Sequence, residues 1–516
     1  MLPLLRHKVD EVALKKKSKK IIIDITHGLN SVSLIEDGVL KEYFVEDGKD
    51  FHITGNIYKG RVVNVLKGLG CAFVDIGREK NGFLQLQESF DERPDLKEAS
   101  LQIKPHELKE GDWILVQALK EELGEKGARL TTNISIAGRF TVYLPELDFV
   151  GVSKKIPLEE HKIQLAKLLK DNKEPHEGLI ARTIAGGLTA KEIVTEIEEL
   201  RETYAEIKDL YVNTGEKVSL LYGEGNLTLR SVRDILGADI DSIVVSDART
   251  ANFLREHFIK KSSRFAHLVE EYKGNYDILD SFDIVLSIDG LLSKKISLPS
   301  GGSIVIEETE ALCAVDVNSG SFKSDKGFAD TILQVNLEAA KEIAKQIQLR
   351  NIGGIIVVDF IDMQSAKDKA AVEKALKEAF SYDRQKTKIL PMTGLGLVEL
   401  TRKKSGSTLS QSLLVRCKQC KSEYATQNPL WVARKLKVQL KRFFTDNHFT
   451  SAIVMLNSEV IDTIFNTRFF TTECEEDWSK KRIYCVPDKS FSQENFEIEG
   501  SNEVALSLPS NAKLLY

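Results

Sequence analysis

Two stretches of sequence decide the fold of the middle of the chain: "GGSIVIEETEALCAVDVNSGSF" at residues 301–322 and "NLEAAKEIAKQIQLRNIGGIIVVDFIDM" at residues 336–363. Apolar runs at 304–307 and 312–317 predict two strands in the first stretch. In the second stretch, the fully apolar run 355–358 predicts a buried strand. These strands indicate an α/β arrangement in this part of the chain.

A long helix is predicted between those strands, over residues 329–349. Its apolar residues recur every three or four positions, as one buried helical face requires. We expect Gly353 and Gly354 to end it. A strand, a helix and a second strand in this order predict a crossover that makes the two strands parallel.

Acidic residues stand at the ends of these predicted parallel strands. Asp316 and Asp359 therefore lie where open α/β sheets place their sites. If the strands are adjacent, they are about 4.8 Å apart, and two carboxylates that close repel each other unless a cation separates them. Mg²⁺ suits such a pair, and Asn318 points to the same side, toward an attacking water or a phosphate. The alternative is that these are ordinary strand-end and helix-capping acids.

The composition is that of a globular protein with several subdomains. The chain has 516 residues, of which 42% are hydrophobic and 29% charged. No apolar run approaches the roughly 18–20 residues that span a bilayer, and no signal peptide is recognisable. Six cysteines, widely spaced except for one pair, favour a reducing compartment, so we expect a cytoplasmic protein. The net charge of −5 does not exclude nucleic acid, because basic residues cluster locally.

The hydrophobic pattern changes along the chain and indicates a multidomain α/β protein. The pattern predicts, in order, a β-meander at 20–45, an all-β segment at 55–135, mixed structure at 140–227, a mainly helical segment at 228–290 with a strand at 243–245, alternating strands and helices at 300–400, a loop-like segment at 401–427 and a small α/β unit at 428–516 that opens with a helix at 431–444.

Two phenylalanines of the β-rich segment point away from its predicted core. Ala72 and Val74 share one strand face, which leaves Phe73 on the other. In the next run Leu84 faces inward and Phe83 outward. Outward rings on neighbouring strands form a surface on which bases can stack, at about 1–3 kcal/mol per base. The alternative is that both rings pack under a neighbouring subdomain. The strand count suits a five-stranded OB barrel.

Two shorter motifs suit a phosphate and a metal. "GLIARTIAGG" (178–187) predicts a strand that runs into a Gly turn, with Arg182 and Thr183 at its end. A guanidinium, a hydroxyl and Gly-rich backbone amides together suit a terminal phosphate. Cys417 and Cys420 form a C-x₂-C pair, which supplies half of a tetrahedral zinc site.

These stretches resemble one family over residues 20–445. "GNIYKGRVVNVLKGLGCAFVDIG" (55–77) resembles the S1 RNA-binding domain embedded in ribonucleases E and G. The stretches 301–322 and 336–363 resemble the DNase-I-like catalytic subdomain of the ribonuclease E/G family. "GLGLVELTRKK" (394–404) matches the segment that joins that subdomain to the metal linker.

The resemblance implies a role for each candidate site residue. Asp316 and Asp359 would bind magnesium, with Asn318 as the supporting amide. Arg182 and Thr183 would sense the 5′-monophosphate of the substrate. The other RNA contacts that the resemblance implies are a backbone contact near Val142 and two guiding lysines, Lys120 and Lys126 of "KEELGEKGARLTT" (120–132), whose alternative interpretation is a charged hairpin tip.

The resemblance also implies that the cysteine pairs of two protomers share one Zn²⁺ and so make a dimer. The expected assembly is a homodimer or a tetramer. Cys417 and Cys420 match those ligands. The sequence departs from the family pattern around them. Lys418 replaces the usual proline, and Lys421-Ser422-Glu423 stands in place of a Gly-rich segment.

The implied architecture is an S1 (OB-fold) barrel inserted in an RNase-H-like subdomain, followed by the catalytic subdomain. The expected boundaries are an RNase-H-like part at 1–50, the S1 domain at 51–131, a 5′-sensor subdomain at 132–227, the second RNase-H-like part at 228–291, the DNase-I-like subdomain at 292–412, a zinc-link at 413–427 and a small C-terminal domain at 428–516.

The resemblance implies a single-strand-specific endoribonuclease that uses metal-activated water and leaves 5′-phosphate and 3′-hydroxyl ends. Processing of ribosomal RNA precursors and mRNA decay are the implied roles. Within the family, a chain that ends at Tyr516 favours the ribonuclease G branch over one with a long C-terminal scaffold. The alternative from a different class is a non-catalytic S1 protein that binds RNA in translation or ribosome assembly.

Overall fold

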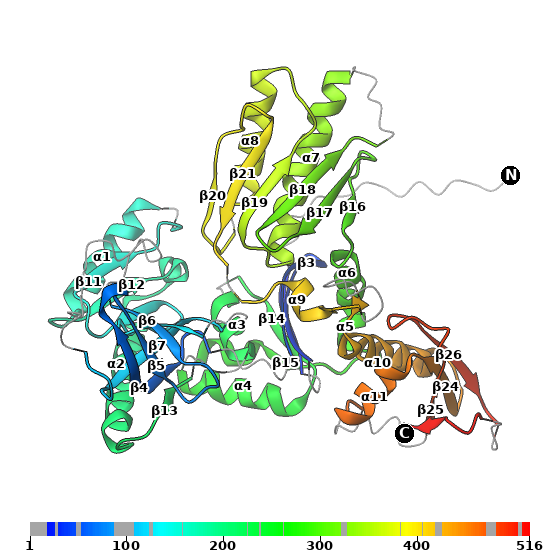
Figure 1. Cartoon of the computed structure of the whole chain (residues 1–516), viewed down its shortest axis with the longest axis horizontal. Helices are drawn as coiled ribbons and strands as arrows, with labels where there is room; N and C mark the ends of the chain where they lie inside the picture. Colours follow the sequence, from blue (N-terminus) through cyan, green and yellow to red (C-terminus); the bar gives the residue numbers. More distant parts are fainter. Residues whose placement is uncertain are drawn as a thin grey trace. The chain divides into compact units, whose positions relative to one another are not determined.

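The computed structural model describes residues 18–25, 29–47, 53–86, 108–122, 127–156, 158–223, 225, 227–236, 239–261, 263–320, 328–381, 383–404, 406–417, 426–470, 481–503 and 508–515. The chain forms two compact units. One unit is Asp50–Asp239, and the other combines Met1–Lys49 with Ile240–Tyr516. Figure 1 labels the helices and strands along the chain.

The unit Asp50–Asp239 opens with a barrel. Its elements are β4 (Ile57–Leu66), η1 (Lys67–Leu69), β5 (Cys71–Asp75), β6 (Gly82–Gln85), β7 (Trp113–Lys120) and β8 (Arg129–Thr131). The strands follow the order β4-β5-β6-β8-β7, and β4 also pairs with β7 and so closes the barrel. Val62, Val74 and Leu130 lie in its apolar core. The prediction of a five-stranded barrel is confirmed, with one further strand, β13 (Ser219–Tyr222), paired to β4.

A second sheet of this unit has the order β11-β12-β10-β9. The elements around it are β9 (Ile136–Ala137), β10 (Thr141–Leu144), β11 (Phe149–Val152), α1 (Glu159–Asn172), β12 (Gly178–Ala181), η4 (Thr183–Gly187), α2 (Ala190–Asn213) and α3 (Leu227–Ile235). Helix α2 covers one face, where Tyr204 packs edge-on against Tyr143 with ring centres 6.2 Å apart. Val142 and Ile180 on the other face are only partly buried.

The other unit contains a sheet built from two distant parts of the chain. Its elements are β1 (Lys19–Asp24), β2 (Leu29–Glu36), β3 (Val39–Asp47), β14 (Ser242–Val245), α4 (Ala248–Lys261), η5 (Ser263–Leu268), β15 (Val269–Glu271), α5 (Ile278–Ser281) and α6 (Ile284–Leu291). The order is β15-β14-β1-β2-β3, and β1 runs parallel to β14 with Lys20 opposite Ser242. The predicted meander and the predicted strand at 243–245 therefore share one sheet.

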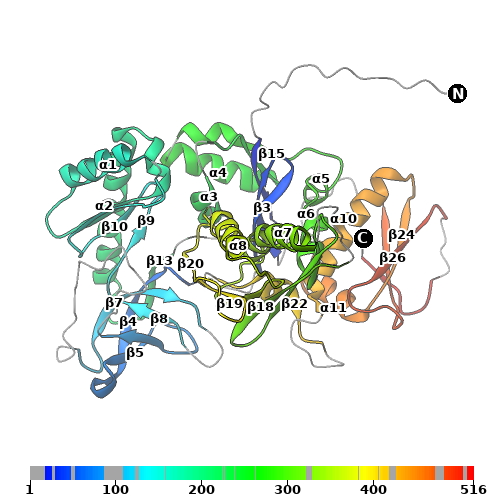
Figure 2. The same cartoon turned by 90° about the horizontal axis from the view of Figure 1, so that it is seen from above.

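A six-stranded sheet follows in the same unit, in the order β16-β17-β18-β19-β21-β20. Its elements are β16 (Lys295–Ser297), β17 (Ser303–Glu308), β18 (Leu312–Asn318), α7 (Phe328–Leu349), β19 (Gly354–Asp359), α8 (Ala366–Ala379), β20 (Thr387–Ile389) and β21 (Leu397–Arg402). As predicted, β18 and β19 are adjacent and parallel. Figure 2 shows α7 and α8 side by side over one face of these strands. Val315, Ile343 and Val358 belong to the apolar core between helices and sheet.

Helix α7 ends at the predicted residue, but the residue that caps it differs from the sequence prediction. The helix ends at Leu349, before the two glycines that we expected to end it. Asn351 adopts the left-handed conformation with φ 52°, and the amide of Ile352 donates to the carbonyl of Ile347 at 3.0 Å. This is the hydrogen bond of a Schellman cap, in which asparagine replaces the more common glycine.

The last part of this unit contains a small α/β layer. Its elements are α9 (Leu409–Leu413), β22 (Leu414–Val415), β23 (Thr426–Gln427), α10 (Pro429–Asp446), β24 (Ser451–Leu456), α11 (Ser458–Asn466), β25 (Arg482–Pro487), β26 (Phe496–Ser501) and β27 (Lys513–Leu514). The helix predicted at 431–444 lies within α10. In the described part of the chain, no helix has both the length and the apolar character needed to cross a bilayer.

Candidate active site

The carboxyl ends of two adjacent parallel strands carry the two predicted acids. Asp316 of β18 lies directly opposite Asp359 of β19 in the backbone register. Their strand neighbours Val315 and Val358 are buried under the helices, whereas both acids are exposed. Because alternate residues of a strand point to opposite faces, both carboxylates lie on the open face of the sheet. Adjacent strands are about 4.8 Å apart, so one cation can contact both side chains.

Asn318 lies on the same open face as the two acids. Its Nδ2 donates a hydrogen bond to Oδ2 of Asp316 at 2.7 Å. We expected this amide to contact water or phosphate, and here it orients the carboxylate of Asp316. The three residues Asp316, Asn318 and Asp359 are therefore brought together as predicted.

A buried asparagine that the sequence prediction missed fixes the chain just beyond Asp359. Asn336 of α7 is fully buried. Its Nδ2 donates to the carbonyl of Ile361 at 2.8 Å, and its Oδ1 accepts from the amide of Ile361 at 3.1 Å. This reciprocal pair ties the end of β19 to the helix. The available signal was a polar residue within an otherwise apolar helical face.

The donor set suits a hard divalent cation. Asp316, Asp359 and Asn318 offer oxygen donors only, and Mg²⁺ commonly takes one or two carboxylates while it keeps several waters. Among the residues that the structure describes, no group of three or more His, Cys, Asp or Glu side chains could hold a metal ion. Two carboxylates and one amide oxygen fit a cation that also coordinates water and substrate oxygen.

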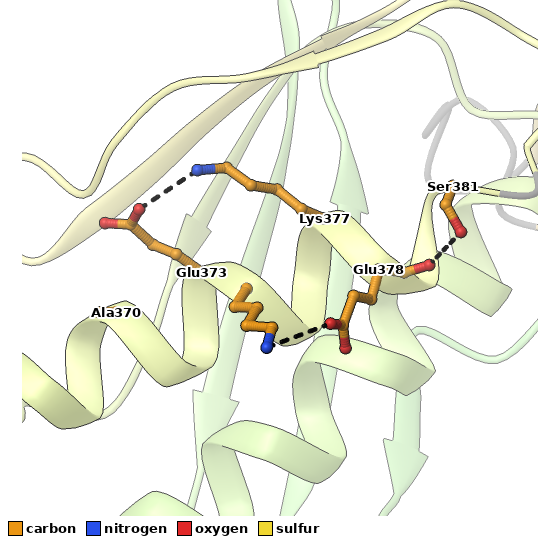
Figure 3. A pocket seen from close by; sticks show the side chains of 6 residues that line it. Ala370, Glu373, Lys377, Glu378 and Ser381 are labelled. Carbon is orange, nitrogen blue, oxygen red and sulfur yellow. Dashed lines mark hydrogen bonds and ion pairs between the residues drawn. The ribbon is translucent and has the colours of Figure 1, made fainter.

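The depression drawn in Figure 3 lies on α8, away from these acids. Lys377 pairs there with Glu373 at 3.5 Å, and Lys374 pairs with Glu378 at 3.7 Å. These are ion pairs between residues one helical turn apart on an exposed surface. Helix α8 packs on the face of the sheet opposite to Asp316, so this depression has no part in the candidate active site.

The outer surface of the barrel carries a row of side chains that includes both predicted aromatics. Phe73 and Phe83 lie opposite one another on β5 and β6, with ring centres 6.0 Å apart at 70°. Both rings are partly exposed. Strand pairing places Arg129 next to Phe83, and Lys120 opposite Arg129. Two aromatic rings and two cations therefore follow one path around the barrel. Lys126 lies outside the described residues.

Arg182 and Thr183 occupy the predicted strand end. Arg182 follows β12, and Thr183 begins η4. The Oγ1 of Thr183 lies 2.8 Å from the Oγ of Ser153, which follows β11. Val142 lies on β10, opposite Ile180 of β12. Ile180 precedes Arg182 by two residues. The structure therefore brings Arg182, Thr183 and Val142 to one sheet, with Ser153 as a residue that we did not predict.

Arg182 is also held by an acidic residue that sequence reasoning missed. Its Nη2 donates to Oδ1 of Asp234 at 2.8 Å, and Nε of Arg233 lies 3.2 Å from the same oxygen. Burial by itself raises the pKa of Asp234, but the charges of Arg233 and Arg182 outweigh it and hold that pKa below its ordinary value. Asp234 is therefore a carboxylate between two guanidinium groups.

The structure describes one of the two predicted zinc ligands. Cys417 is a free, partly buried cysteine, and Cys420 is outside the described residues. Cys71, Cys313 and Cys485 are free and buried. Burial raises the pKa of the thiols of Cys313 and Cys485 to about 12, so both are protonated and inert at neutral pH.

The chain contains paired acids on the open face of a parallel strand pair and, in its other unit, a barrel with outward aromatics. These two features suggest a nuclease, and comparison with known proteins agrees. The model of the Ribonuclease E/G family matches residues 135–405, more than half of the chain. The chain belongs to the ribonuclease E/G family and is a hydrolase that acts on RNA. The family prediction made from the sequence is confirmed.

Ribonuclease G proteins match along nearly their whole length. The chain is 33% identical to ribonuclease G of Haemophilus influenzae over 486 residues, which cover 93% of this chain and 99% of that protein. It is 31% identical to ribonuclease G of Escherichia coli K12 over 484 residues, with the same coverage. Ribonuclease E of Nostoc is 36% identical over 406 residues, but only 58% of that protein is covered. Within its family, the chain is therefore an endoribonuclease similar to ribonuclease G.

Proposed function

We propose that the chain is a magnesium-dependent endoribonuclease that cuts single-stranded RNA to 5′-phosphate and 3′-hydroxyl ends. The observation that carries this proposal is the register of β18 and β19, with Asp316 opposite Asp359 on an open sheet face. Two carboxylates at such positions repel one another unless a cation lies between them. Family membership favours this enzyme over the alternative of a non-catalytic RNA-binding protein.

We assign a separate role in the reaction to each residue of this site. Asp316 and Asp359 would hold Mg²⁺, and Asn318 keeps the carboxylate of Asp316 in position. When bound, the cation supplies positive charge that offsets the charge of the phosphodiester and of its transition state. The amide oxygen of Asn318 is an acceptor that can orient the attacking water. Asn336 holds the chain after Asp359, so the pair of acids is preorganised.

Unpaired bases would stack on Phe73 and Phe83, whose half-exposed rings face outward from neighbouring strands. Lys120 and Lys126 would meet phosphates of the same strand. A duplex keeps its bases stacked on each other, which explains a preference for single strands. The 5′ end would be held by Arg182 and Thr183, with a backbone contact from Val142, so substrates with a 5′-monophosphate would be favoured.

The remaining assignments follow from the family resemblance. We assign residues 51–131 to an S1 domain, 132–227 to the 5′ sensor, 1–50 and 228–291 to an RNase-H-like subdomain, 292–412 to a DNase-I-like catalytic subdomain, 413–427 to a zinc-link and 428–516 to a small C-terminal domain. The barrel strands and the two-part sheet support the first and third of these. Cys417 and Cys420 would share Zn²⁺ with a second protomer in a homodimer or tetramer. The roles would be ribosomal RNA processing and mRNA decay in the cytoplasm, which the buried free cysteines favour.

The decisive variants are Asp316→Asn and Asp359→Asn, because each removes one charge from the pair with little change in shape. We expect cleavage of a short unstructured RNA to fall by about a hundredfold or more, while RNA affinity measured in EDTA is retained. Glu399→Gln is the matched control, since Glu399 is an exposed acid of β21 on the same sheet face. Full activity in either Asp variant would defeat the proposal.

End recognition needs a separate measurement. One RNA carrying a 5′-monophosphate or a 5′-hydroxyl is cleaved with and without Mg²⁺. We expect no cleavage without the cation and faster cleavage of the phosphorylated RNA with it. Arg182→Ala should equalise the two substrates. If the wild-type protein cleaved both RNAs at the same rate, the sensor assignment would be contradicted. The active-site assignment would not be affected.

A further inference from the structure

The guanidinium of Arg182 is held by contacts on two sides. Its Nη1 donates to the carbonyl of Gly138 at 2.7 Å, and its Nη2 donates to Oδ1 of Asp234 at 2.8 Å. A guanidinium has five N–H donors in one rigid plane. Two such bonds fix the plane, and among the described residues no acceptor takes the other three donors. Arg182 is therefore oriented before a phosphate arrives.

A buried carboxylate fixes the segment whose Gly138 carbonyl accepts from Arg182. Glu196 of α2 accepts from the backbone amides of Arg139, Phe140 and Thr141 at 2.7–2.8 Å. These bonds fix the segment that presents the Gly138 carbonyl. A Cβ at Gly138 would lie 2.7 Å from the Glu196 carboxylate, so the segment has no room to shift toward α2.

Asp234, the acid that accepts from Arg182, belongs to α3. Asp234 is 38% exposed in its side chain and also contacts Arg233, whose Nη1 donates to the carbonyl of Ala137 at 3.4 Å. Arg233 thus ties α3 to β9, next to the segment that carries Gly138. Arg182, Arg233 and Asp234 together carry one net positive charge, since two guanidinium groups flank one carboxylate.

We propose that Asp234 is a positioning residue for recognition of the 5′-phosphate, acting through Arg182. This rests on the proposed sensor function of Arg182 and Thr183. A long arginine side chain gives up conformational freedom when it grips a ligand, and prior orientation removes that loss from the binding step. The opposite role is that the Asp234 carboxylate competes with the phosphate for Arg182. The two roles predict opposite changes when Asp234 is replaced.

The test measures binding, so that catalysis does not enter. The probe is a short, fully 2′-O-methylated RNA with either a 5′-monophosphate or a 5′-hydroxyl, titrated in EDTA by fluorescence anisotropy. The quantity compared is the ratio of the two dissociation constants. Asp234→Ala removes both acceptor and charge, whereas Asp234→Asn keeps an acceptor oxygen and removes only the charge. Glu159→Ala is the control, because it removes an exposed acid that pairs with Lys162 elsewhere in the same unit.

We expect Asp234→Ala to reduce the preference for the 5′-phosphate by roughly tenfold, the lower end of what loss of an orienting partner costs at metal sites. Asp234→Asn should stay within about threefold of wild type, because the amide oxygen still accepts from Arg182. Glu159→Ala should not change the ratio. A purely structural role for Asp234 would lower thermal stability and weaken both probes equally.

The proposal is overturned, while the sensor assignment stands, if Asp234→Ala keeps the wild-type preference for the 5′-phosphate or shows a stronger one. A loss of equal size in Asp234→Asn and Asp234→Ala would also overturn it, because charge rather than position would then matter. A wild-type protein with no preference overturns the sensor function itself and this proposal with it. The wild-type measurement therefore separates the two failures.

Discussion

Arg434→Met is the substitution whose effect on stability follows most directly from the structure. Arg434 of α10 is buried, and its three nitrogens are all engaged. Its Nε donates to Oδ2 of Asp24 at 2.9 Å. Its Nη1 and Nη2 donate to the two oxygens of Asp277 at 2.9 and 2.8 Å. The guanidinium thus joins α10 to the end of β1 and to the start of α5.

Methionine fills a similar volume but leaves two buried carboxylates without their cation. Asp277 cannot turn away without loss, because its Oδ1 also accepts from the amide of Leu279 at the start of α5. Removal of one partner from a buried ion pair costs about 3–5 kcal/mol, mostly because the remaining charge is uncompensated. We expect a loss in this range. The triple variant Asp24→Asn, Asp277→Asn, Arg434→Met should recover much of it, since neither of the two buried acids is then left charged.

The loss should depend on pH in a defined direction. Burial raises the pKa of Asp277, but Arg434 outweighs burial and holds that pKa below its ordinary value. In the wild type, this contribution to stability is present above about pH 4 and is lost as the pH falls below it. Without Arg434, only the Leu279 amide and the charge of Lys437 oppose the effect of burial, so the pKa of Asp277 in the folded variant rises. The deficit of the variant is then largest at neutral pH and shrinks below about pH 5.

The assay is hydrogen exchange followed by mass spectrometry of peptides from α10 and β1, because a global unfolding curve would mix the two units. Exchange at pH 7 should be faster in both peptides of Arg434→Met, while peptides from the barrel serve as an internal reference. Wild-type protection in the variant, or a deficit that widens on acidification, would refute the argument from uncompensated charge.

Three further changes test other parts of the structure. Phe83→Ala should weaken binding of unstructured RNA in EDTA by roughly 5- to 150-fold, because one lost stacking contact costs about 1–3 kcal/mol. Unchanged binding in anisotropy titrations would exclude Phe83 from the RNA surface. Asn336→Ala removes the partner of the amide and carbonyl of Ile361, so hydrogen exchange of peptides from α7 and β19 should show a loss of about 2–3 kcal/mol, together with reduced cleavage. Full activity would show that the end of β19 needs no anchor. Burial raises the pKa of Glu177, but its bonds to Arg201 outweigh burial and lower that pKa, so the stabilisation should vanish as the pH falls below about 4.5. Glu177→Gln should abolish that part of the acid sensitivity in hydrogen exchange of peptides from residues 50–239 of the full chain.

The paired acids could be predicted because every step of that inference is local. Side chains alternate between the two faces of a strand, which places Asp316 on the face opposite Val315. A crossover helix makes the two strands parallel. The outward direction of Phe73 and Phe83 follows from the same alternation. The strand and helix bounds at 300–360, including the end of α7 at Leu349, were within a few residues for the same reason. The expected cap of α7 was wrong, because a left-handed asparagine leaves no periodic signal.

The residues that hold the candidate sites could not be predicted, because their partners are distant in the sequence. Asp234 is 52 residues from Arg182, and Asp24 is 410 residues from Arg434. Hydrophobic periodicity reports which face of one element is buried, but not which polar side chain meets another across the fold. Nothing in the sequence around Asp234 separates it from any other exposed acid of a helix.

The two-part sheet has a consequence for biosynthesis. Strand β1 leaves the ribosome with β2 and β3, but its parallel partner β14 follows 222 residues later, counted from Lys20 to the paired Ser242. At about 5–20 residues per second, the partner arrives roughly 10–45 s afterwards. Until then the Ile-rich edge of β1 is an open template for unwanted pairing. The nascent chain must shield that edge, or have it shielded, while the interrupting unit emerges and folds.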